Sequence, residues 1–315
     1  MAYLAIETSD PRGSLALFDD DGPIDVIEFR DSMAHARETA AALRSLLARR
    51  GLAIGALRGI AVSVGPGSYT GCRVGVTTAK SLAFALGLAV LPVSSLEVLA
   101  AGTRATETAR AAAVGVAGTA PRPGERLVPL IDARRGYWYS ANFELATDAS
   151  IVRCGADRVS RGADLDLLAA SSVGAGGATV AIEATARSPA DSGRRSGAPG
   201  AVRTWVFGDG ADAFLTRPDA AAHAAARLAP GPGVVARSGA TSDDAPAGVL
   251  ARGPRFWDVP SARSLAELAR ERFAMALVDP EAIHALAPAY LRPSEPELVL
   301  ARRLASRNAS PAERG

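Results

Sequence analysis

The chain has 315 residues, of which 48% are apolar and 22% charged, and its formal net charge is +2. This length is enough for one large globular domain or for two lobes with a sizeable core. The near-neutral charge excludes a protein that holds nucleic acid by its overall field, and no apolar run reaches the ~20 residues of a membrane span.

The first hundred residues predict a mixed sheet covered by helices. Apolar or alternating runs predict strands at 3–7, 14–18, 24–29, 60–64 and 88–93. Helices are expected at 33–50, with Asp31 or Ser32 as the N-cap and Gly51 as the stop, then at 70–87, and again from Ser94 or Ser95 onward. The order β-β-β-α-β-α-β-α indicates an α/β protein.

The second part of the chain echoes the first hairpin. After a stretch at 100–125 that reads as a helix ending in a linker, strands are predicted at 127–131 and 137–145 around an Asp-Ala-Arg-Arg-Gly turn. A duplicated lobe is therefore expected. A short strand at 205–207, a Gly-Asp-Gly turn with a helix after it, and an amphipathic helix at 264–278 complete the prediction.

Two regions are poor in aromatic residues and rich in Ala, Gly, Ser, Pro and Arg, and we expect them to be low-complexity insertions without a core of their own. They are residues 155–200 and 228–254. The predicted domains are an N-terminal lobe, 1–100, a C-terminal lobe, 101–304, and a flexible tail, 305–315.

The most informative segment is a glycine-rich turn between a strand and a helix, from Gly65 to Gly71. It is neither a P-loop nor a dinucleotide fingerprint, because its glycine spacing differs from both and Cys72 replaces the phosphate-binding lysine. The turn could bind an anion on the helix N-terminus, or it could only turn the chain sharply. With carboxylates at strand ends, the candidate nucleotide or anion site comprises Glu7, Thr8, Gly65, Gly67, Ser68, Gly208 and Asp209.

Small and apolar residues recur at three- and four-residue steps on the first two helices, which could pack on the chain's own sheet or on a partner. The candidate partner-binding residues are His35, Thr39, Leu43, Leu46, Cys72, Gly75, Val76, Ala79 and Ala83. No metal site is predicted, since the three histidines have no ligand at zinc-site spacing, and no catalytic residue is identified. The two cysteines suggest no disulfide, and no secretory signal is seen, so a cytoplasmic protein is expected.

Several of these segments together resemble the TsaB (YeaZ) family. The resemblance is dense over residues 3–100 and thinner afterwards. It is carried by Leu4-Ala5-Ile6-Glu7-Thr8-Ser9, by Val62 to Gly75, by Thr78-Ala79-Lys80-Ser81-Leu82-Ala83, by Val93 to Glu97, by Ile131 to Gly136, by Gly208 to Ala211 and by Ala289-Tyr290-Leu291-Arg292-Pro293-Ser294.

The resemblance implies a duplicated fold of the actin, Hsp70 and sugar-kinase type, with a mixed sheet and covering helices in each lobe. It further implies a non-catalytic subunit that binds a TsaD-like transferase through its first two long helices, for threonylcarbamoyladenosine modification of the adenosine next to the tRNA anticodon. A TsaE-like ATPase and tRNA would join the complex, and the chain could form a homodimer when alone.

Some family features differ in this chain. Glu7 stands where aspartate is usual in the family. No cofactor is expected to be required, although weak binding of ATP, ADP or magnesium is an open alternative. Two other functions stay open: an active ATP-dependent transferase or kinase of the same fold, and a metallopeptidase-like protein.

Overall fold

Two sheets built to the same plan form the two lobes of the molecule. The computed structural model describes residues 2–29, 35–104, 120–161, 204–217 and 250–293, together with residues 297, 299, 300, 303 and 304. The first sheet has the strand order β3-β2-β1-β4-β5. Its strands are β1 (Ala2–Glu7), β2 (Gly13–Asp19), β3 (Gly22–Phe29), β4 (Leu57–Ser63) and β5 (Ala89–Val93).

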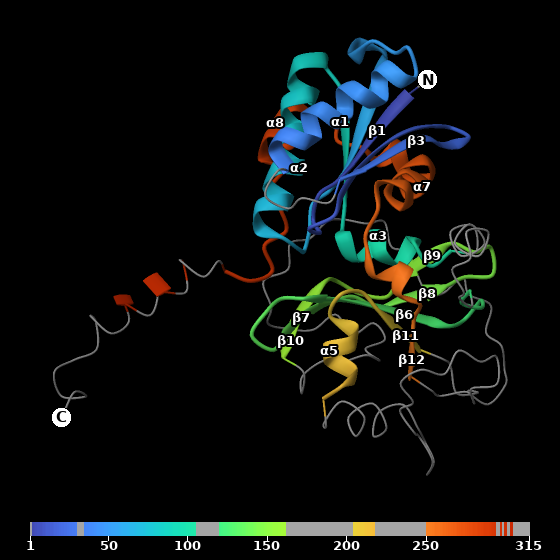
Figure 1. Ribbon diagram of the computed structural model, residues 1–315, viewed down its shortest axis with the longest axis vertical. Coiled ribbons are helices and arrows are strands. Elements are labelled where there is room, and N and C mark those ends of the chain that lie inside the picture. Colours follow the sequence, from blue (N-terminus) through green and yellow to red (C-terminus); the bar gives the residue numbers. More distant parts are fainter. Residues whose placement is uncertain are drawn as a thin grey trace.

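The second sheet follows the order β10-β7-β6-β11-β12, and it lies below the first in Figure 1. In each sheet the central strand, β1 or β6, pairs antiparallel with the strand after it and parallel with a later one. The outer strands repeat this pattern, with β3 and β10 antiparallel and β5 and β12 parallel to their neighbours. This repetition confirms the duplicated two-lobe fold.

The strands of the second lobe are β6 (Arg126–Asp132), β7 (Tyr137–Ser140), β8 (Phe143–Leu145), β9 (Ile151–Arg153), β10 (Arg158–Arg161), β11 (Thr204–Phe207) and β12 (Leu250–Arg252). The single strand predicted at 137–145 is two strands, because β7 pairs with the end of β6 and β8 with its beginning. Strands β10 and β12 lie where insertions were predicted at 155–200 and 228–254. The remainder of those insertions, 162–200 and 228–249, and the tail 305–315 lie outside the described residues.

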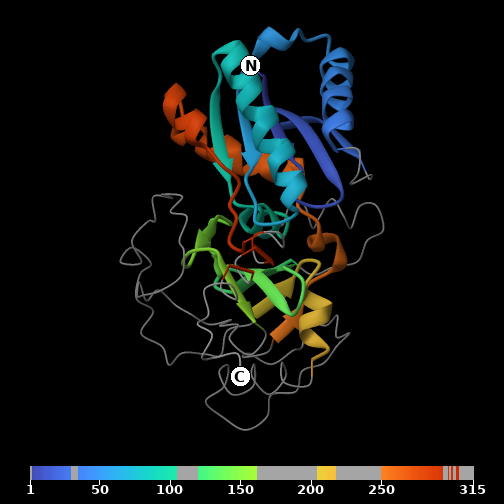
Figure 2. The same ribbon diagram turned by 90° about the vertical axis from the view of Figure 1, so that its left-hand side faces the viewer.

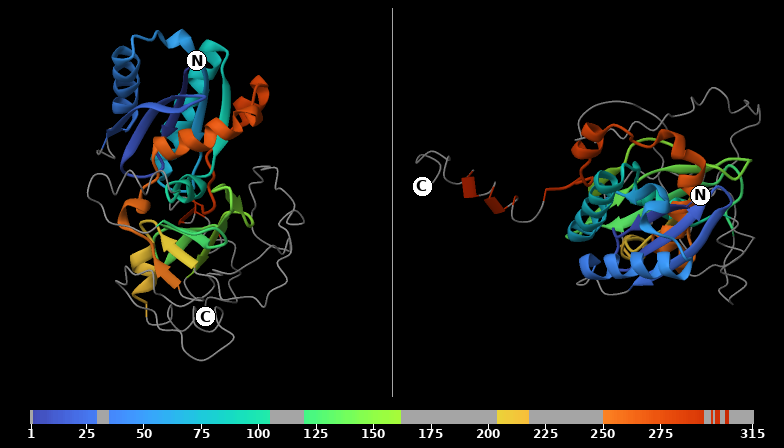
Figure 3. Two further views of the ribbon diagram at one scale, coloured as in Figure 1. Left: turned by 90° about the vertical axis from the view of Figure 1, so that its right-hand side faces the viewer. Right: turned by 90° about the horizontal axis from the view of Figure 1, so that it is seen from above.

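Helices cover both faces of the first sheet. The outer face carries α1 (His35–Arg49) and α2 (Tyr69–Leu86), while α3 (Ser95–Ala101) and α7 (Ala262–Arg272) lie between the two sheets (Figures 1 and 3). Successive side chains of β1 point to opposite faces of the sheet. Leu4 and Ile6 pack in the core under α1 and α2, and Ala5 packs in the core that the two lobes share. The predicted caps Asp31 and Ser32 of α1 lie outside the described residues.

Both ends of α2 are fixed by the residue types that the sequence places there. The hydroxyl of Ser68 accepts a hydrogen bond from the Gly71 amide at 3.2 Å, and Gly87 ends the helix in the left-handed conformation, with φ +66°. The short helix α5 (Ala211–Leu215) follows β11, as the Gly-Asp-Gly turn predicted.

The end of the chain returns to the first lobe, in contrast to the predicted boundary at residue 100. Helix α7 packs on β1, β2 and β3, and α8 (Pro280–Ala285) packs on α2. The amide of Ala262 donates to the Ser14 hydroxyl at 2.8 Å. The inner face of the first sheet is apolar and must be covered, and the leucines of α7 supply that cover.

Helix α7 is shorter than the predicted helix at 264–278. A 3₁₀ turn, η5 (Phe273–Met275), follows it, and the chain then runs alongside β5. The amide of Leu277 donates to the Val90 carbonyl at 2.7 Å, and the Val90 amide donates back at 2.9 Å. These two bonds take the place of a further helical turn.

Candidate functional site

The glycines of the turn allow α2 to lie directly against the end of β1. A Cβ atom on Gly71 would stand 1.9 Å from the Thr8 carbonyl oxygen, and one on Gly67 would stand 2.4 Å from that of Ser9. A Cβ on Gly75 would lie 2.4 Å from Thr8 Oγ1, which itself donates to the Gly71 carbonyl at 2.8 Å. The glycines therefore serve close backbone packing.

Two backbone donors of the turn are already bonded within the chain. The amide of Ser68 donates to the Ser9 carbonyl at 2.7 Å, and the Gly71 amide donates to the Ser68 hydroxyl at 3.2 Å. Gly65, at φ +102°, accepts from the Ser95 amide at 2.8 Å through its carbonyl oxygen. These bonds favour the packing interpretation of the turn over the anion-binding one.

Glu7 is a fully buried carboxyl at the end of β1. Its Oε1 accepts hydrogen bonds from the Ser9 amide and the Ser9 hydroxyl, both at 2.6 Å, while its buried Oε2 has no direct hydrogen-bond partner within the described residues. Burial raises the pKa of Glu7 to about 7, although the two bonds from Ser9 and the Ser63 hydroxyl oppose the shift. Burial therefore favours the protonated form of this carboxyl at a higher pH than in an exposed glutamate.

Cys72 is a buried thiol on the adjoining first turn of α2. Burial raises its pKa to about 12, and the nearby Glu7 carboxyl adds to the shift. Cys72 therefore stays a protonated thiol and is no nucleophile at neutral pH.

The second lobe has a matching strand end at Gly208 and Asp209. A Cβ on Gly208 would stand 2.2 Å from the Leu130 carbonyl oxygen, and Asp209 accepts from the Asp132 amide at 2.9 Å. Burial raises the pKa of Asp209, and the carboxylates of Asp10 and Asp132 reinforce the shift. Acidic strand ends of the two lobes thus face one another, but no three metal-ligating side chains among the described residues could hold a metal ion.

The residues predicted to bind a partner on α1 and α2 are core residues of this chain. Their side chains turn toward β1, β2 and β4, because the thin, apolar faces of both helices pack on the sheet. The side chain of His35 lies outside the described part. The structure buries the other predicted partner-binding residues: Thr39, Leu43, Leu46, Cys72, Gly75, Val76, Ala79 and Ala83. Any partner resting on α1 and α2 would therefore contact their opposite faces.

Those opposite faces form the candidate protein-interaction surface, which we call the helix face. The two helices lie side by side on the outside of the first lobe (Figure 2). Most exposed side chains on it are small, so another helix could approach closely. The helix face comprises Ala40, Ala41, Arg44, Ser45 and Ala48 of α1, and Arg73, Thr77, Ser81, Phe84 and Ala85 of α2.

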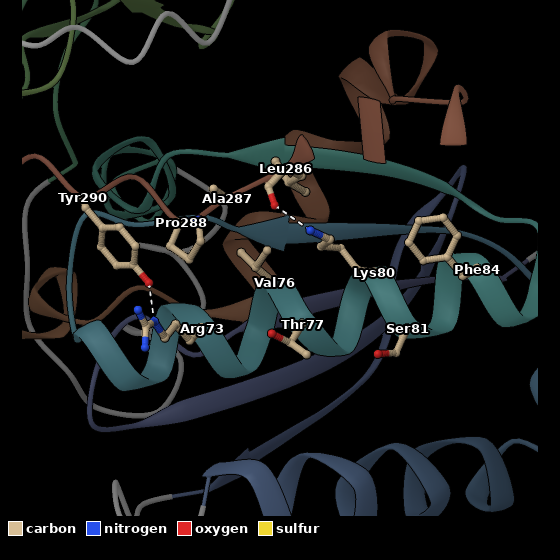
Figure 4. Close-up of a pocket in the computed structure, with 10 residues that line it drawn as sticks. All are labelled: Arg73, Val76, Thr77, Lys80, Ser81, Phe84, Leu286, Ala287, Pro288 and Tyr290. Carbon is tan, nitrogen blue, oxygen red and sulfur yellow. Dashed lines mark hydrogen bonds between the residues drawn. The ribbon is translucent and has the colours of Figure 1, made fainter. Parts of the chain in front are cut away.

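A groove of about 530 Å³ borders the helix face, between α2 and residues 286–290. Figure 4 shows the side chains of Arg73, Lys80 and Phe84 rising from α2 toward this segment. Lys80, the only lysine of the chain, donates to the carbonyls that end α8, at 3.0 Å for Leu286. Sequence reasoning missed the groove because its second wall lies two hundred residues away. The lone lysine and the Ala-Tyr-Leu-Arg segment were its only signals.

A strap continues from the groove to the second lobe. The Ala289 amide donates to the Val64 carbonyl at 2.7 Å beside the glycine turn, and Tyr290 stacks on Tyr69 at 4.8 Å. Arg292 then donates to the Ala133 carbonyl at 2.8 Å. Residues 286–293 therefore connect α2 to the β6–β7 turn.

Comparison with known proteins agrees with this architecture. The family model of TsaD, the tRNA N6-adenosine threonylcarbamoyltransferase, matches residues 30–187, about half of the chain. The solved structure of YeaZ from Pseudomonas aeruginosa superposes with a TM-score of 0.56 at 20% identity, covering 92% of this chain and 99% of that one. A second structure, a protein from the same organism described as similar to the peptidase YeaZ, has a TM-score of 0.58 at 22% identity, with the same coverage.

Curated relatives carry a more specific name. The tRNA threonylcarbamoyladenosine biosynthesis protein TsaB of Bacillus subtilis is 36% identical over 144 residues, 46% of this chain and 56% of that protein. The TsaB of Escherichia coli is 28% identical over 144 residues, 46% of this chain and 55% of that protein. The chain thus spans about half the length of the curated relatives that it matches. On these findings the chain belongs to the TsaD family, and three of its curated relatives are TsaB proteins.

Proposed function

We propose that this chain is a non-catalytic subunit that binds and activates a TsaD-like tRNA threonylcarbamoyladenosine transferase. The observation that carries the proposal is its similarity to TsaB proteins of three bacteria. The modified residue would be the adenosine next to the tRNA anticodon. The partner would be a protein of the same family, because the matching family model is that of TsaD.

The helix face supports this role. Small side chains such as Ala41 of α1 and Ser81 of α2 are exposed and leave room for helices of a partner. Burying apolar helix surface contributes about 25 cal/mol per Å² before the cost of association. Such a contact would activate the partner by stabilising one arrangement of its own active site.

We propose that this subunit requires no nucleotide or metal of its own. The bonded Ser68 and Gly71 amides of the glycine turn and the complete burial of Glu7 support this proposal, because they leave little open surface for a phosphate or magnesium ion. In the same proposal a TsaE-like ATPase and tRNA join the assembled complex, which works in the cytoplasm. Within the described residues no helix has the length and apolar character needed to span a membrane.

The test is co-purification with the TsaD-like protein of the same cell. Arginine at two exposed positions, Ala41→Arg and Ser81→Arg, should lower the amount of bound partner at least about tenfold, a change of about 1.4 kcal/mol. The matched control is Thr147→Arg, at an exposed position of the second lobe. Gly75 and Ala79 are unsuitable, since arginine there would disrupt the core.

The same variants are then compared for threonylcarbamoyladenosine in tRNA by mass spectrometry of cells that depend on them. Loss of the modification with the two helix-face variants, and its retention with the control, would support the proposal. A complex that survives the double variant would show that the helix face is not the contact. Normal modification in cells without this chain would overturn the function itself.

A further inference from the structure

One tyrosine of the second lobe is contacted by two arginines from different parts of the chain. The guanidinium carbon of Arg292, on the strap, lies 4.5 Å from the centre of the Tyr137 ring, and that of Arg161, on β10, lies 4.9 Å from it. Tyr137 and Arg161 are register partners at the edge of the second sheet, so their side chains share one face of it. Two cations are therefore held close together on one ring.

Neither of these two arginines forms an ion pair with a carboxylate in the part of the chain that the structure describes. Arg292 donates through Nη1 to the Ala133 and Arg134 carbonyls, at 2.8 and 3.2 Å, which fixes its guanidinium without neutralising it. The carboxylate of Asp132, at the end of β6, is paired with Arg134 at 3.2 Å. Within the described residues, the charges of Arg161 and Arg292 are thus left for a ligand.

The same surface continues along the strap to the start of α2. Tyr290 accepts a hydrogen bond from Arg73 Nε at 2.7 Å (Figure 4), and it stacks on Tyr69 at 4.8 Å. Both tyrosines are 38% exposed. Because the Glu297 carboxylate acts electrostatically on Arg73, the uncompensated charge lies at the other end of this surface. We call the surface the arginine–tyrosine row, and it comprises Tyr69, Arg73, Tyr290, Arg292, Tyr137 and Arg161.

The chemistry of the row suits a polyanion that carries flat rings. Arginine forms charge-assisted hydrogen bonds with phosphate oxygens, and exposed tyrosine rings offer surface to the bases of RNA. The net charge of the whole chain is only +2, so the attraction is local to the row. An acidic protein segment would meet the arginines equally well, but it has no counterpart for the alternating tyrosines. The composition of the row therefore favours RNA.

We propose that the arginine–tyrosine row contacts the backbone of the tRNA substrate, with Arg161 and Arg292 as the phosphate contacts. The proposal rests on the proposed function, which supplies the tRNA. Arg73 belongs both to the row and to the helix face, so a TsaD-like partner on the helix face would lie directly beside the row. A tRNA bound by the partner would extend onto this subunit, which would position the RNA without taking part in the chemistry.

The test is the salt dependence of tRNA binding to the complex of this chain with the TsaD-like protein. The probe is an unmodified transcript of a tRNA that has adenosine next to its anticodon, and fluorescence anisotropy measures its affinity. Each lost phosphate contact lowers the slope of log affinity against log salt concentration by about 0.8. Arg161→Ala should show this decrease and a loss of affinity on the order of fivefold at about 0.1 M salt.

Two further variants separate charge from structure. Arg161→Lys should keep the slope and most of the affinity, because the charge remains at an exposed position. Arg58→Ala, at an exposed position of β4 and at the opposite end of that strand from the strap, is the control and should change neither quantity. Thermal unfolding of every variant verifies that a loss of binding is not a loss of folding.

The outcomes distinguish a failure of the row from a failure of the proposed function. An unchanged slope and affinity with Arg161→Ala, in a complex that forms and modifies tRNA, overturns the row and leaves the proposed function intact. If no complex forms, the proposed function fails, and the isolated chain at low salt decides the row. Binding of the transcript that depends on Arg161 then supports the row, and absence of binding overturns it.

A competition experiment distinguishes RNA from an acidic protein segment. Poly-glutamate at the same concentration of charge should displace the transcript only weakly, because it offers nothing to the tyrosines. Displacement as complete as that by unlabelled tRNA would show that the row recognises carboxylates, and it would overturn the assignment to RNA.

Discussion

Arg153 of β9 donates to Glu97 of α3 at 3.2 Å, which ties the second sheet to the helix layer between the lobes. Arg272 of α7 donates to the other oxygen of the same carboxylate. Arg153 also bonds Asp157 at 2.5 Å. Three segments that are distant in sequence thus meet on one carboxylate, which is only 7% exposed.

Glu97→Gln should destabilise the chain by about 3 kcal/mol at pH 7, because the half-buried Arg272 and Arg153 each lose the charge of this buried carboxylate. Burial would raise the pKa of Glu97, but Arg153 and Arg272 outweigh it and lower the pKa below its ordinary value. The stabilisation is therefore complete above about pH 4.5 and is lost as the pH falls through the lowered pKa. Urea unfolding of both proteins at pH 7 and pH 3 measures the difference, which should shrink in acid. An equal difference at both pH values would contradict the assignment.

Glu7→Gln should have the opposite pH dependence. The folded carboxyl has a pKa of about 7, against 4.5 for an exposed one, so the folded state binds its proton more tightly. That stabilisation is complete below pH 4.5 and is lost as the pH rises through 7, on the order of 3 kcal/mol in total. The variant keeps an oxygen acceptor for Ser9 and carries no charge. It should therefore be more stable than the original chain at pH 9 and similar at pH 5, by thermal unfolding.

The control for this pH dependence is Glu144→Gln, at an exposed position of β8. It should leave the difference in stability between pH 5 and pH 9 unchanged. A Glu7→Gln chain that loses as much stability between pH 5 and pH 9 as the original would show that another group carries the dependence.

Gly71→Ala should destabilise the chain by several kcal/mol, since the added methyl would lie 1.9 Å from the Thr8 carbonyl oxygen, a backbone atom. Gly55→Ala is the matched control, because nothing lies within 4 Å of a Cβ at that position. Denaturant midpoints of the two variants should differ clearly, with Gly55→Ala within about 0.5 kcal/mol of the original chain. A tolerated Gly71→Ala would mean that α2 can shift away from β1.

Arg292→Ala should loosen the β6–β7 turn. The variant loses two hydrogen bonds to the Ala133 and Arg134 carbonyls and the stacking of the guanidinium on Tyr137, at 4.5 Å. Arg134 and Arg135 occupy the left-handed region, at φ +65° and +56°, so the turn depends on external support. Hydrogen exchange of residues 133–137 should become faster, with a cost of about 1 to 2 kcal/mol in unfolding. Unchanged exchange there would exclude a supporting role for the strap.

Local sequence signals predicted most elements of the first lobe. Ser68 and Gly87 mark the ends of α2 because capping chemistry depends only on neighbouring residues. The hairpin predicted at 127–131 and 137–145 resembles the first hairpin, and it indicated the second sheet because a hairpin also depends on neighbouring residues. The sequence did not predict which sheet α7 covers, because its apolar stripe fits any apolar surface. Its partners are also distant in sequence: Ser14, which bonds Ala262, lies 248 residues before it.

The sequence did not show which surface the small residues of α2 pack against. Gly75 and Ala79 make one side of the helix thin, and a thin side serves a sheet of the same chain as well as a helix of another. Periodicity shows which residues share one face of the helix, but it does not show whether the chain's own sheet or another protein packs on that face. Only the tertiary contact between Gly75 and Thr8 decides the question.

The return of α7 to the first lobe has a consequence for synthesis on the ribosome. The inner face of the first sheet, with Ala5, Ala16 and Phe18, is complete once β5 has emerged, but α7, the helix that packs on β1 and β2, begins only at Ala262. Through more than half of translation this apolar face therefore lacks the helix that covers most of it. Nascent chains that stall before α7 should therefore be captured by chaperones, and the lobe that is first in sequence finishes folding last.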